Sequence, residues 1–272
     1  MKDIQSKIPE NVRGTFTKIR SRIPISNKGL MMIGILILGA VIAYVSIVII
    51  LRYLKIGALL NKCIIRGSKN GKTSLVIRQS GAGPKQILKT MDMNKGLEFT
   101  YSLWININSL EYNKDKKIKP IFYKSKKETV VEVSESDYAP GVFLLDTNTL
   151  RIAMQTGLEE AQKMEYIDVT NIPLKKWFHL GLFIKQESMD VYINGQMLQS
   201  KRFTALPSQN DGDLYITTDG GFDGMISNMK FYAYRISYDK LNKILKDGPK
   251  TGNKCETSDL PPYFHHKWWL FR

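Results

Sequence analysis

Residues 177–195 read WFHLGLFIKQESMDVYING, and this segment decides the fold of the central part of the chain. Two runs rich in β-branched and aromatic residues, Trp177–Gln186 and Met189–Ile193, flank a short polar stretch, as neighbouring strands do. The second run leads into Asn194-Gly195, the pair that a tight primed turn requires because both central residues need a positive φ. We therefore predict antiparallel strands with a hairpin at Ile193–Gln196.

Further short runs of the same composition lie on both sides of this segment, separated by Gly, Asn, Asp and Pro. They cover residues 73–77, 97–107, 119–123, 141–145, 150–155, 165–169, 213–217 and 224–234. This pattern favours an all-β fold, a two-sheet antiparallel sandwich, over alternating βαβ units. One helix is predicted at Tyr238–Lys246, with Ser237 as its N-cap and Gly248-Pro249 as its stop.

A different pattern precedes the strands. Residues 29–51 carry no formal charge and are flanked by Lys28 and Arg52. As a helix they would be ~34 Å long, enough to cross a hydrocarbon core of ~30 Å. A cleaved signal peptide fits poorly, because the run is long and no small-x-small cleavage site follows it. We predict a single-pass, uncleaved anchor in a lipid bilayer. Gly39 and Ala43 lie four apart, which is compatible with helix pairing and a homo-oligomer.

The formal net charge of +15 resembles that of a nucleic-acid binder, but the distribution of the charge along the chain does not fit this class of protein. Residues 1–28 carry a net +5 and residues 52–91 a net +9, whereas residues 92–250 are neutral. The charge therefore brackets the apolar run, and we expect no nucleic acid as a partner. Each flank of the run has five nearby cations, so the positive-inside rule leaves the orientation undecided.

These observations divide the chain into five parts. They are a basic N-terminal segment (1–28), a transmembrane helix (29–51), a basic juxtamembrane connector (52–70), a β-sandwich (71–250) and an aromatic-rich tail (251–272).

Four blocks in order carry a family resemblance. They are EFTYSLWI at 98–105, WFHLGL at 177–182, MDVYING at 189–195 and FDGMISNMKFY at 222–232. Together they resemble laminin G-like, concanavalin A-like domains over about residues 72–248. The resemblance implies a two-sheet jelly roll of a kind used to bind carbohydrate or other proteins. Trp104 and Trp177 are expected to fill the space between the two sheets, with His179 on the same face as Trp177.

Some relatives of this fold are glycanases that place two carboxylates on one strand face. Here Glu132 and Glu135 are three residues apart, so an extended strand points them to opposite faces. The chain also lacks a Gly-x-Ser-x-Gly elbow, a phosphate-cradling loop and a His-Glu-x-x-His helix. We therefore expect no enzymatic activity and no required cofactor, with a glycan hydrolase as the weakest alternative.

Binding residues are expected in the loop that contains Asp211, Asp213, Asp219 and Asp223. Carboxylates in such loops can hold Ca²⁺, and Phe222 can offer an aromatic face to a sugar ring. The alternative is that Asp and Gly are here because turns require them, and the sequence leaves the metal unknown.

The two cysteines each end an Asn-Lys-Cys tripeptide, and they bracket the sandwich. Because jelly-roll termini often lie close together, a Cys63–Cys255 disulfide is geometrically feasible. Two free thiols in a reducing compartment are the alternative.

The tail carries five aromatic residues in twelve positions, beginning at Pro261. Tyr and Trp favour membrane interfaces and protein contacts, because they combine apolar area with a polar edge. The docking candidates are Tyr263, Phe264, Trp268, Trp269 and Phe271. The alternative is a tail folded back on its own sandwich.

Taken together, the sequence predicts a non-enzymatic, single-pass membrane protein whose jelly roll binds or scaffolds. In one version it links a membrane to a protein partner or lattice, as a structural component of a virion would. Lysines outnumber arginines, which is compatible with an AT-rich genome such as that of a large DNA virus. In the other version it is a cell-surface lectin that binds glycans.

Overall fold

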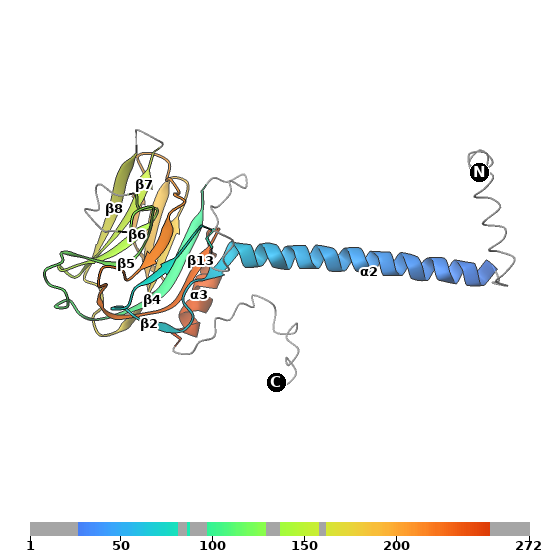
Figure 1. Ribbon diagram of the computed structural model, residues 1–272, viewed down its shortest axis with the longest axis horizontal. Helices are drawn as coiled ribbons and strands as arrows, with labels where there is room; N and C mark the ends of the chain where they lie inside the picture. The colour runs from blue at the N-terminus through green and yellow to red at the C-terminus, as the bar shows by residue number, and fades with distance from the viewer. Residues whose placement is uncertain (1–26, 81–85, 88–96, 129–136, 158–161, 251–272) are drawn as a thin grey trace. The chain divides into compact units, whose positions relative to one another are not determined.

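The computed structural model describes residues 27–80, 86–87, 97–128, 137–157 and 162–250 (Figure 1). The chain divides into two compact units, Met1–Ile56 and Gly57–Arg272, which we describe one at a time. The predicted tail, residues 251–272, lies outside the described residues, as do Glu132 and Glu135.

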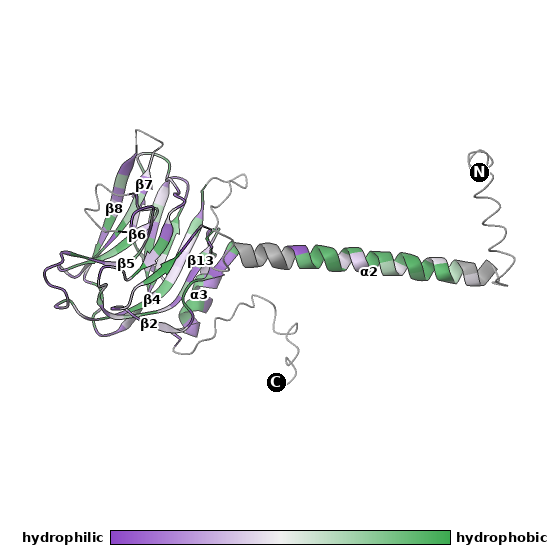
Figure 2. Ribbon diagram, viewed as in Figure 1, coloured by the Kyte–Doolittle hydropathy of each residue, from purple (hydrophilic) through white to green (hydrophobic). Residues whose placement is uncertain are grey.

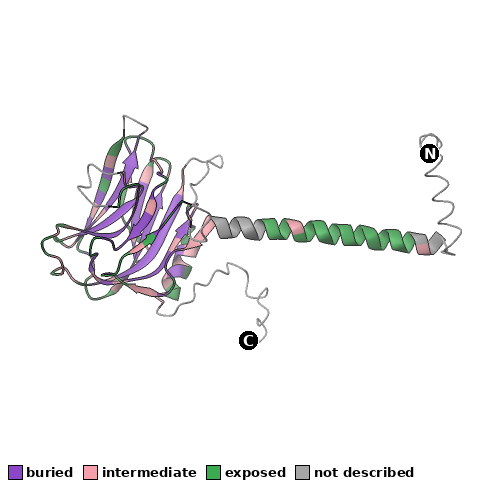
Figure 3. Cartoon of the chain, viewed as in Figure 1, coloured by how far each residue is buried: buried purple, intermediate pink, exposed green. Residues whose placement is uncertain are grey.

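Helix α2 (Asn27–Leu60) contains the predicted apolar run. Its stretch Met31–Arg52 is strongly hydrophobic on average, and nearly all of its residues are exposed (Figures 2 and 3). Ser46, a polar residue in this stretch, donates its hydroxyl hydrogen to the carbonyl of Ile42 at 2.8 Å, so its hydroxyl is hydrogen-bonded within the helix. By length and composition α2 can serve as a membrane span or as a signal sequence.

The second unit is a sandwich of two antiparallel sheets, which confirms the predicted fold class. The strands of the seven-stranded sheet are, in spatial order, β1 (Asn61–Cys63), β13 (Asp223–Tyr232), β4 (Phe99–Ser109), β9 (Trp177–Ile184), β10 (Ser188–Ile193) and β11 (Gln196–Arg202), and β2 (Ser68–Asn70) also pairs with β13. The strands of the six-stranded sheet are, in spatial order, β3 (Leu75–Ile77), β12 (Asp213–Ile216), β5 (Ile118–Ser125), β6 (Gly141–Leu145), β7 (Thr149–Thr156) and β8 (Lys163–Thr170).

Each predicted run contains or overlaps one of these strands, and the predicted turn at Asn194-Gly195 has φ values of 50° and 84°. Three strands were not predicted. β1 and β2 are three-residue polar pieces, NKC and SKN, that pair only with β13. β11 is an almost fully exposed edge strand, so it has no apolar alternation to detect.

The core lies between the sheets, and its register corrects the expectation for both tryptophans. Leu103, Ile105 and Ile107 of β4 are fully buried and point into the core. Because side chains alternate along a strand, Trp104 points to the outer face, and so does Trp177, which pairs with Asn106. The space between the sheets is therefore filled by aliphatic residues and by Phe and Tyr rings instead.

The outer face of the seven-stranded sheet is covered in part by α3 (Tyr238–Asp247). As predicted, Ser237 caps this helix, accepting a hydrogen bond from the backbone N–H of Lys240. Leu241 and Ile244 of α3 pack with Phe183, Tyr232 and Ile236 in a cluster separate from the core. Part of this sheet face would otherwise be open to solvent. The amphipathic helix covers it and so creates a second buried layer.

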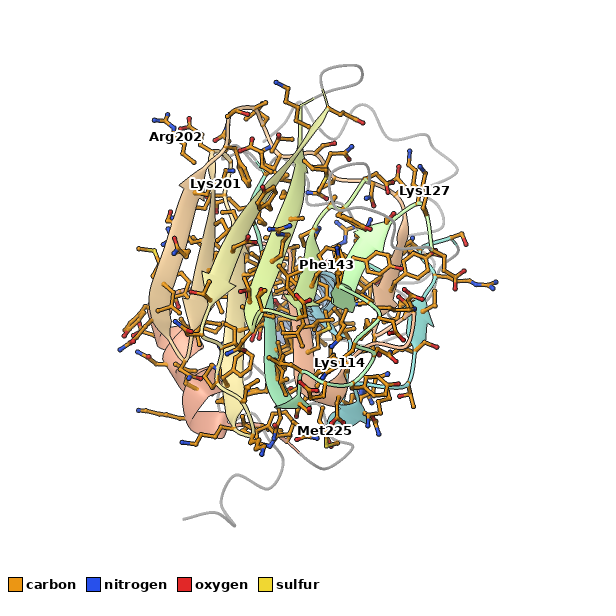
Figure 4. The ribbon with its side chains drawn as sticks, turned by 90° about the vertical axis from the view of Figure 1, so that its left-hand side faces the viewer. Lys114, Lys127, Phe143, Lys201, Arg202 and Met225 are labelled. Atoms are coloured by element: carbon orange, nitrogen blue, oxygen red, sulfur yellow. The ribbon has the colours of Figure 1, made fainter. Side chains whose placement is uncertain are left out.

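The two ends of the sandwich differ in their relation to the chain. Asn61, the residue after α2, pairs with Tyr232 at one end of β13, and we call this the proximal end. Asp223, at the other end of β13, pairs with Ser109 and marks the distal end. Strand β13 is ten residues long, so the proximal and distal ends lie about 30 Å apart. The distal loops are 71–74, 110–117, 146–148, 171–176 and 217–222, with the turn 194–195. In Figure 4 the distal end, marked by Lys114 and Met225, lies opposite Lys127, Lys201 and Arg202.

Candidate functional site

The outer face of the six-stranded sheet carries an aromatic cluster around Phe143 (Figure 4). Tyr123 stacks on Tyr215 at 5.0 Å and on Phe143 at 6.0 Å, and Tyr138 packs edge-on against Tyr123. None of these four rings is more than 6% exposed. The hydroxyl of Tyr123 donates to the carbonyl of Glu128. The centre of this face is therefore filled by the domain's own rings.

The distal loops are held in unusual backbone conformations. Among the described residues, eight non-glycine residues have a positive φ, and seven of these lie at the distal end: Asn113, Asn148, Asn171, Lys175, Asn194, Thr217 and Asp219. Asn and Asp tolerate this region at low cost, but Thr and Lys do not. Outliers of this kind persist only where surrounding structure over-determines them, and they cluster at functional sites. Among the loops that the structure describes, those of the distal end are thus the most constrained.

Two ion pairs join these loops. Lys72 Nζ lies 2.8 Å from Asp223 Oδ1 and 4.6 Å from the ring centroid of Tyr112, so three loops meet at this cation. Lys116 pairs with Asp219 and also donates to the Asp219 carbonyl at 2.9 Å. Sequence reasoning missed Lys72, Lys116 and Tyr112, because a lysine or tyrosine in a polar loop gives no indication of which residue it contacts. They make a polar, cross-braced surface.

The structure separates the predicted loop residues. Asp219 and Asp223 reach the distal end, whereas Asp213 lies at the proximal end and accepts a hydrogen bond from the Gln79 backbone at 2.7 Å. Asp211 lies two residues before Asp213, at the start of the same strand. Phe222 is fully buried in the core, which corrects the expectation that its ring faces a sugar. Strand β12 (Asp213–Ile216) crosses the sheet, so carboxylates close in sequence end up at opposite ends.

The distal carboxylates face lysines instead of one another. Among the described residues, no three His, Cys, Asp or Glu side chains lie together in a group that could hold a metal ion. Asp219 and Asp223 are each engaged by an ammonium group. The arrangement favours loop bracing over cation coordination, because Ca²⁺ needs several oxygen ligands that converge on one point.

A buried serine–histidine pair lies elsewhere, on the outer face of the seven-stranded sheet. Ser102 Oγ is 2.9 Å from His179 Nε2, and the indole of Trp104 packs edge-on against the imidazole at 5.3 Å. Burial lowers the pKa of His179 to about 4, so the ring is neutral at pH 7. His179 is wholly buried, and within the described part of the chain its Nδ1 has no hydrogen-bond partner. No described carboxylate orients this histidine as in a catalytic triad, and solvent does not reach the pair.

The cysteine and tail predictions fall partly outside the described chain. Cys63, on β1, is disulfide-bonded. The chain's other cysteine, Cys255, and the docking candidates Tyr263, Phe264, Trp268, Trp269 and Phe271 are not among the described residues. Their pairing and docking roles stay predictions.

Residues 80–241 match the family model described as the concanavalin A-like lectin/glucanases superfamily. Solved structures with a similar fold include the botulinum neurotoxin serotype D binding domain, at 16% identity and a TM-score of 0.47, covering 67% of this chain and 41% of that one. They also include the sialidase of Trypanosoma rangeli, at 16% identity and a TM-score of 0.43, covering 68% of this chain and 28% of that one. The chain thus spans less than half the length of either. No curated protein sequence matches it.

Proposed function

Since this chain belongs to the concanavalin A-like lectin/glucanases superfamily, we propose that it is a non-enzymatic binding module held at a membrane by α2. Its distal end is the surface that contacts the partner. The observation that carries this proposal is the contrast between the two ends. The chain runs from α2 into the proximal end, and the constrained loops with their ion pairs gather at the other.

A fixed set of loops favours binding because little conformational entropy remains to be lost when a partner docks. The cross-links Lys72–Asp223 and Lys116–Asp219 each join loops more than a hundred residues apart in sequence, so the distal surface behaves as one unit. Loops on a rigid scaffold are the usual carriers of binding function. This supports the distal end over the sheet faces.

A protein partner is favoured over a glycan. Sugar rings are typically held by an exposed aromatic face with polar groups beside it, and the four rings at the centre of the six-stranded sheet are buried. The distal surface is instead polar and charged, as the rim of a protein interface is. We propose that the module links its membrane to a protein partner or lattice, which can be that of a virion. The tail from Tyr263 to Phe271 serves as a second docking segment.

The proposal of a non-enzymatic role is supported by the burial of His179, the one histidine among the described residues, which solvent does not reach. A glycan hydrolase would need two carboxylates facing a cleft. Glu132 and Glu135, which the sequence singled out, would point to opposite faces of an extended strand.

Site-specific photo-crosslinking in the source membrane tests this function. A photoreactive amino acid replaces Leu174, an exposed residue of the distal loop 171–176, in the full-length chain. The control places it at Tyr238, an equally large exposed residue near the start of α3. We expect one defined protein adduct from position 174 and none from 238. Equal adducts from both positions, or none from 174 beside strong binding on a glycan array, would reject the proposal in favour of a surface lectin.

The tail is tested separately by truncation after Ser258. If it docks on a lattice, the truncated protein stays folded but no longer co-sediments with native particles. A lower melting temperature would show instead that the tail packs on its own sandwich.

A further inference from the structure

The charges at the distal end do not balance. Eight lysines lie in or beside the distal loops: Lys69, Lys72, Lys114, Lys116, Lys117, Lys119, Lys175 and Lys176. Five acidic residues accompany them: Glu111, Asp115, Asp146, Asp219 and Asp223. Six of these lysines and all five acidic residues lie within 92–250, where they leave a net +1, and Lys69 and Lys72, which precede residue 92, raise the net charge of this end to +3.

Three of the acidic residues are already neutralised by lysines of the same end. Asp223 pairs with Lys72, Asp219 pairs with Lys116, and Glu111 pairs with Lys114. Two further lysines point inward. Lys69 donates to the hydroxyl of Thr217 at 2.9 Å, and Lys119 is buried, donating to the carbonyl of Leu110.

The lysines that remain are Lys117, Lys175 and Lys176, which we call the distal lysine set. All three are exposed, and within the described part of the chain they form no ion pair. Asp115 and Asp146 are the acidic residues left at this end. Three unpaired lysines on two adjoining loops, 110–117 and 171–176, therefore outnumber the two acidic residues left at this end.

Lys175 is held in place at a conformational cost. Its φ is +58°, and its backbone N–H donates to the carbonyl of Ile107 at 2.7 Å, which ties the loop to the end of β4. A glycine or asparagine fits such a position with little strain, as Asn171 does four residues earlier. Lysine, by contrast, gains no local stabilisation from a left-handed backbone conformation. A costly residue at a fixed position points to a role for the side chain itself.

We propose that the distal end binds an acidic protein surface and that Lys117, Lys175 and Lys176 make the contact. This inference rests on the proposed function, in which the distal end meets a protein partner, and it gives that partner its chemistry. Carboxylate groups on the partner complete the ion pairs that the distal acids leave open. Because the loops are braced by ion pairs, the lysines are held at fixed positions. Charge complementary to that of the partner speeds encounter and excludes positively charged competitors.

Lysine chemistry separates this partner from phosphate-bearing ones. The distal loops contain no arginine, the side chain that grips phosphate with two parallel hydrogen bonds. An ammonium group is a point charge that pairs equally well with a single carboxylate oxygen. Nucleic acid and anionic lipid are therefore the competing occupants that the experiment has to reject.

The experiment uses the full-length chain in nanodiscs of neutral lipid, with poly-L-glutamate as the probe. A triple variant, Lys117→Gln, Lys175→Gln and Lys176→Gln, should weaken binding about tenfold or more at low salt. The matched control neutralises three exposed lysines elsewhere, Lys126, Lys127 and Lys163, and should weaken it less than twofold. Raising the ionic strength should weaken the wild type and bring it towards the triple variant, since exposed pairs are screened.

Equal losses in the two triple variants would show non-specific attraction and overturn the proposal. Preference for heparin or for phosphatidylserine vesicles over poly-L-glutamate would overturn it as well. Lys175→Gly separates strain from charge. It should raise the melting temperature by about 2–4 °C while lowering affinity, and Lys175→Asn should lower affinity with the fold unchanged. A lower melting temperature for Lys175→Gly would contradict the strain argument.

The outcomes distinguish this inference from the function on which it rests. If the crosslink from position 174 persists unchanged in the triple variant, the distal end meets a protein but the lysines do not select it. If no crosslink forms while poly-L-glutamate still binds through the distal lysine set, the charge selectivity stands without the proposed protein partner.

Discussion

Replacing Glu165 with alanine should destabilise the sandwich by about 3 kcal/mol, because this side chain joins the two sheets at their open edge. Its side chain is only 7% exposed. Oε1 accepts hydrogen bonds from the Thr156 hydroxyl at 3.1 Å and from the Thr204 N–H and hydroxyl, both at 2.8 Å. Oε2 lies 3.5 Å from Lys201 Nζ. Thr156 belongs to β7, whereas Thr204 follows β11 of the other sheet.

The magnitude follows from what alanine leaves behind. The Thr204 N–H loses its acceptor at a part-buried place, which costs about 1 kcal/mol. The two hydroxyl bonds to a charged oxygen add about 1 kcal/mol each, since the Thr204 hydroxyl can turn to water and the buried Thr156 hydroxyl can turn to the carbonyl of Lys163. The pair with Lys201 adds little, because that ammonium is partly exposed. Glu165→Gln keeps an acceptor and should cost about 1 kcal/mol.

The charge of Glu165 gives a second signature. Burial alone would raise its pKa, but the hydrogen bonds from Thr204 and Thr156 and the charge of Lys201 outweigh burial and lower the pKa below its usual value. A lowered pKa contributes stability that is present above the unfolded-state value and is lost as pH falls through the folded one. The difference between wild type and Glu165→Gln should therefore shrink in acid.

The assay is urea unfolding of the full-length protein in nanodiscs, followed by tryptophan fluorescence at pH 7 and in acid. The control is Asp168→Ala on the same strand, which breaks an ion pair with Arg151 that is about one-third exposed and should cost less than about 1 kcal/mol. A loss for Glu165→Ala no larger than that of the control would refute the reasoning.

Three further predictions concern other parts of the chain. Deleting residues 29–51 should move the protein from a detergent-requiring fraction to the soluble one, as centrifugation would show. The free energy of unfolding should fall by about 3 kcal/mol between pH 6.5 and 4, because the lowered pKa of His179 makes the unfolded state bind the proton first. In urea titrations, His179→Gln should remove this pH dependence. Gly212→Ala should cost about 3 kcal/mol or more, since its Cβ would lie 2.0 Å from the Ser125 backbone, whereas Gly248→Ala, with open space and a φ of +67°, should cost about 1 kcal/mol in thermal melts.

Local chemistry was enough to predict most elements of the fold. The Asn194-Gly195 turn, the Ser237 cap and the apolar run at 29–51 each depend on residues within a few positions of one another, so the sequence alone identifies them. Strand alternation likewise predicts that β4 has two different faces. It does not say which face is covered, because β4 is covered on both sides, and Trp104 was therefore assigned to the wrong layer.

The candidate site depended on tertiary structure. Asp213 and Asp219 are six residues apart, yet a strand carries them to opposite ends, while Lys116 meets Asp219 across a hundred residues. Sequence composition determined that this chain has an anchor-like helix and an all-β domain, since both follow from short-range hydrophobic patterns. Which charged side chains pair, and which lysines of the described distal end stay unpaired, was decided only by strand order, because ion pairing depends on distances through space that sequence separation does not set.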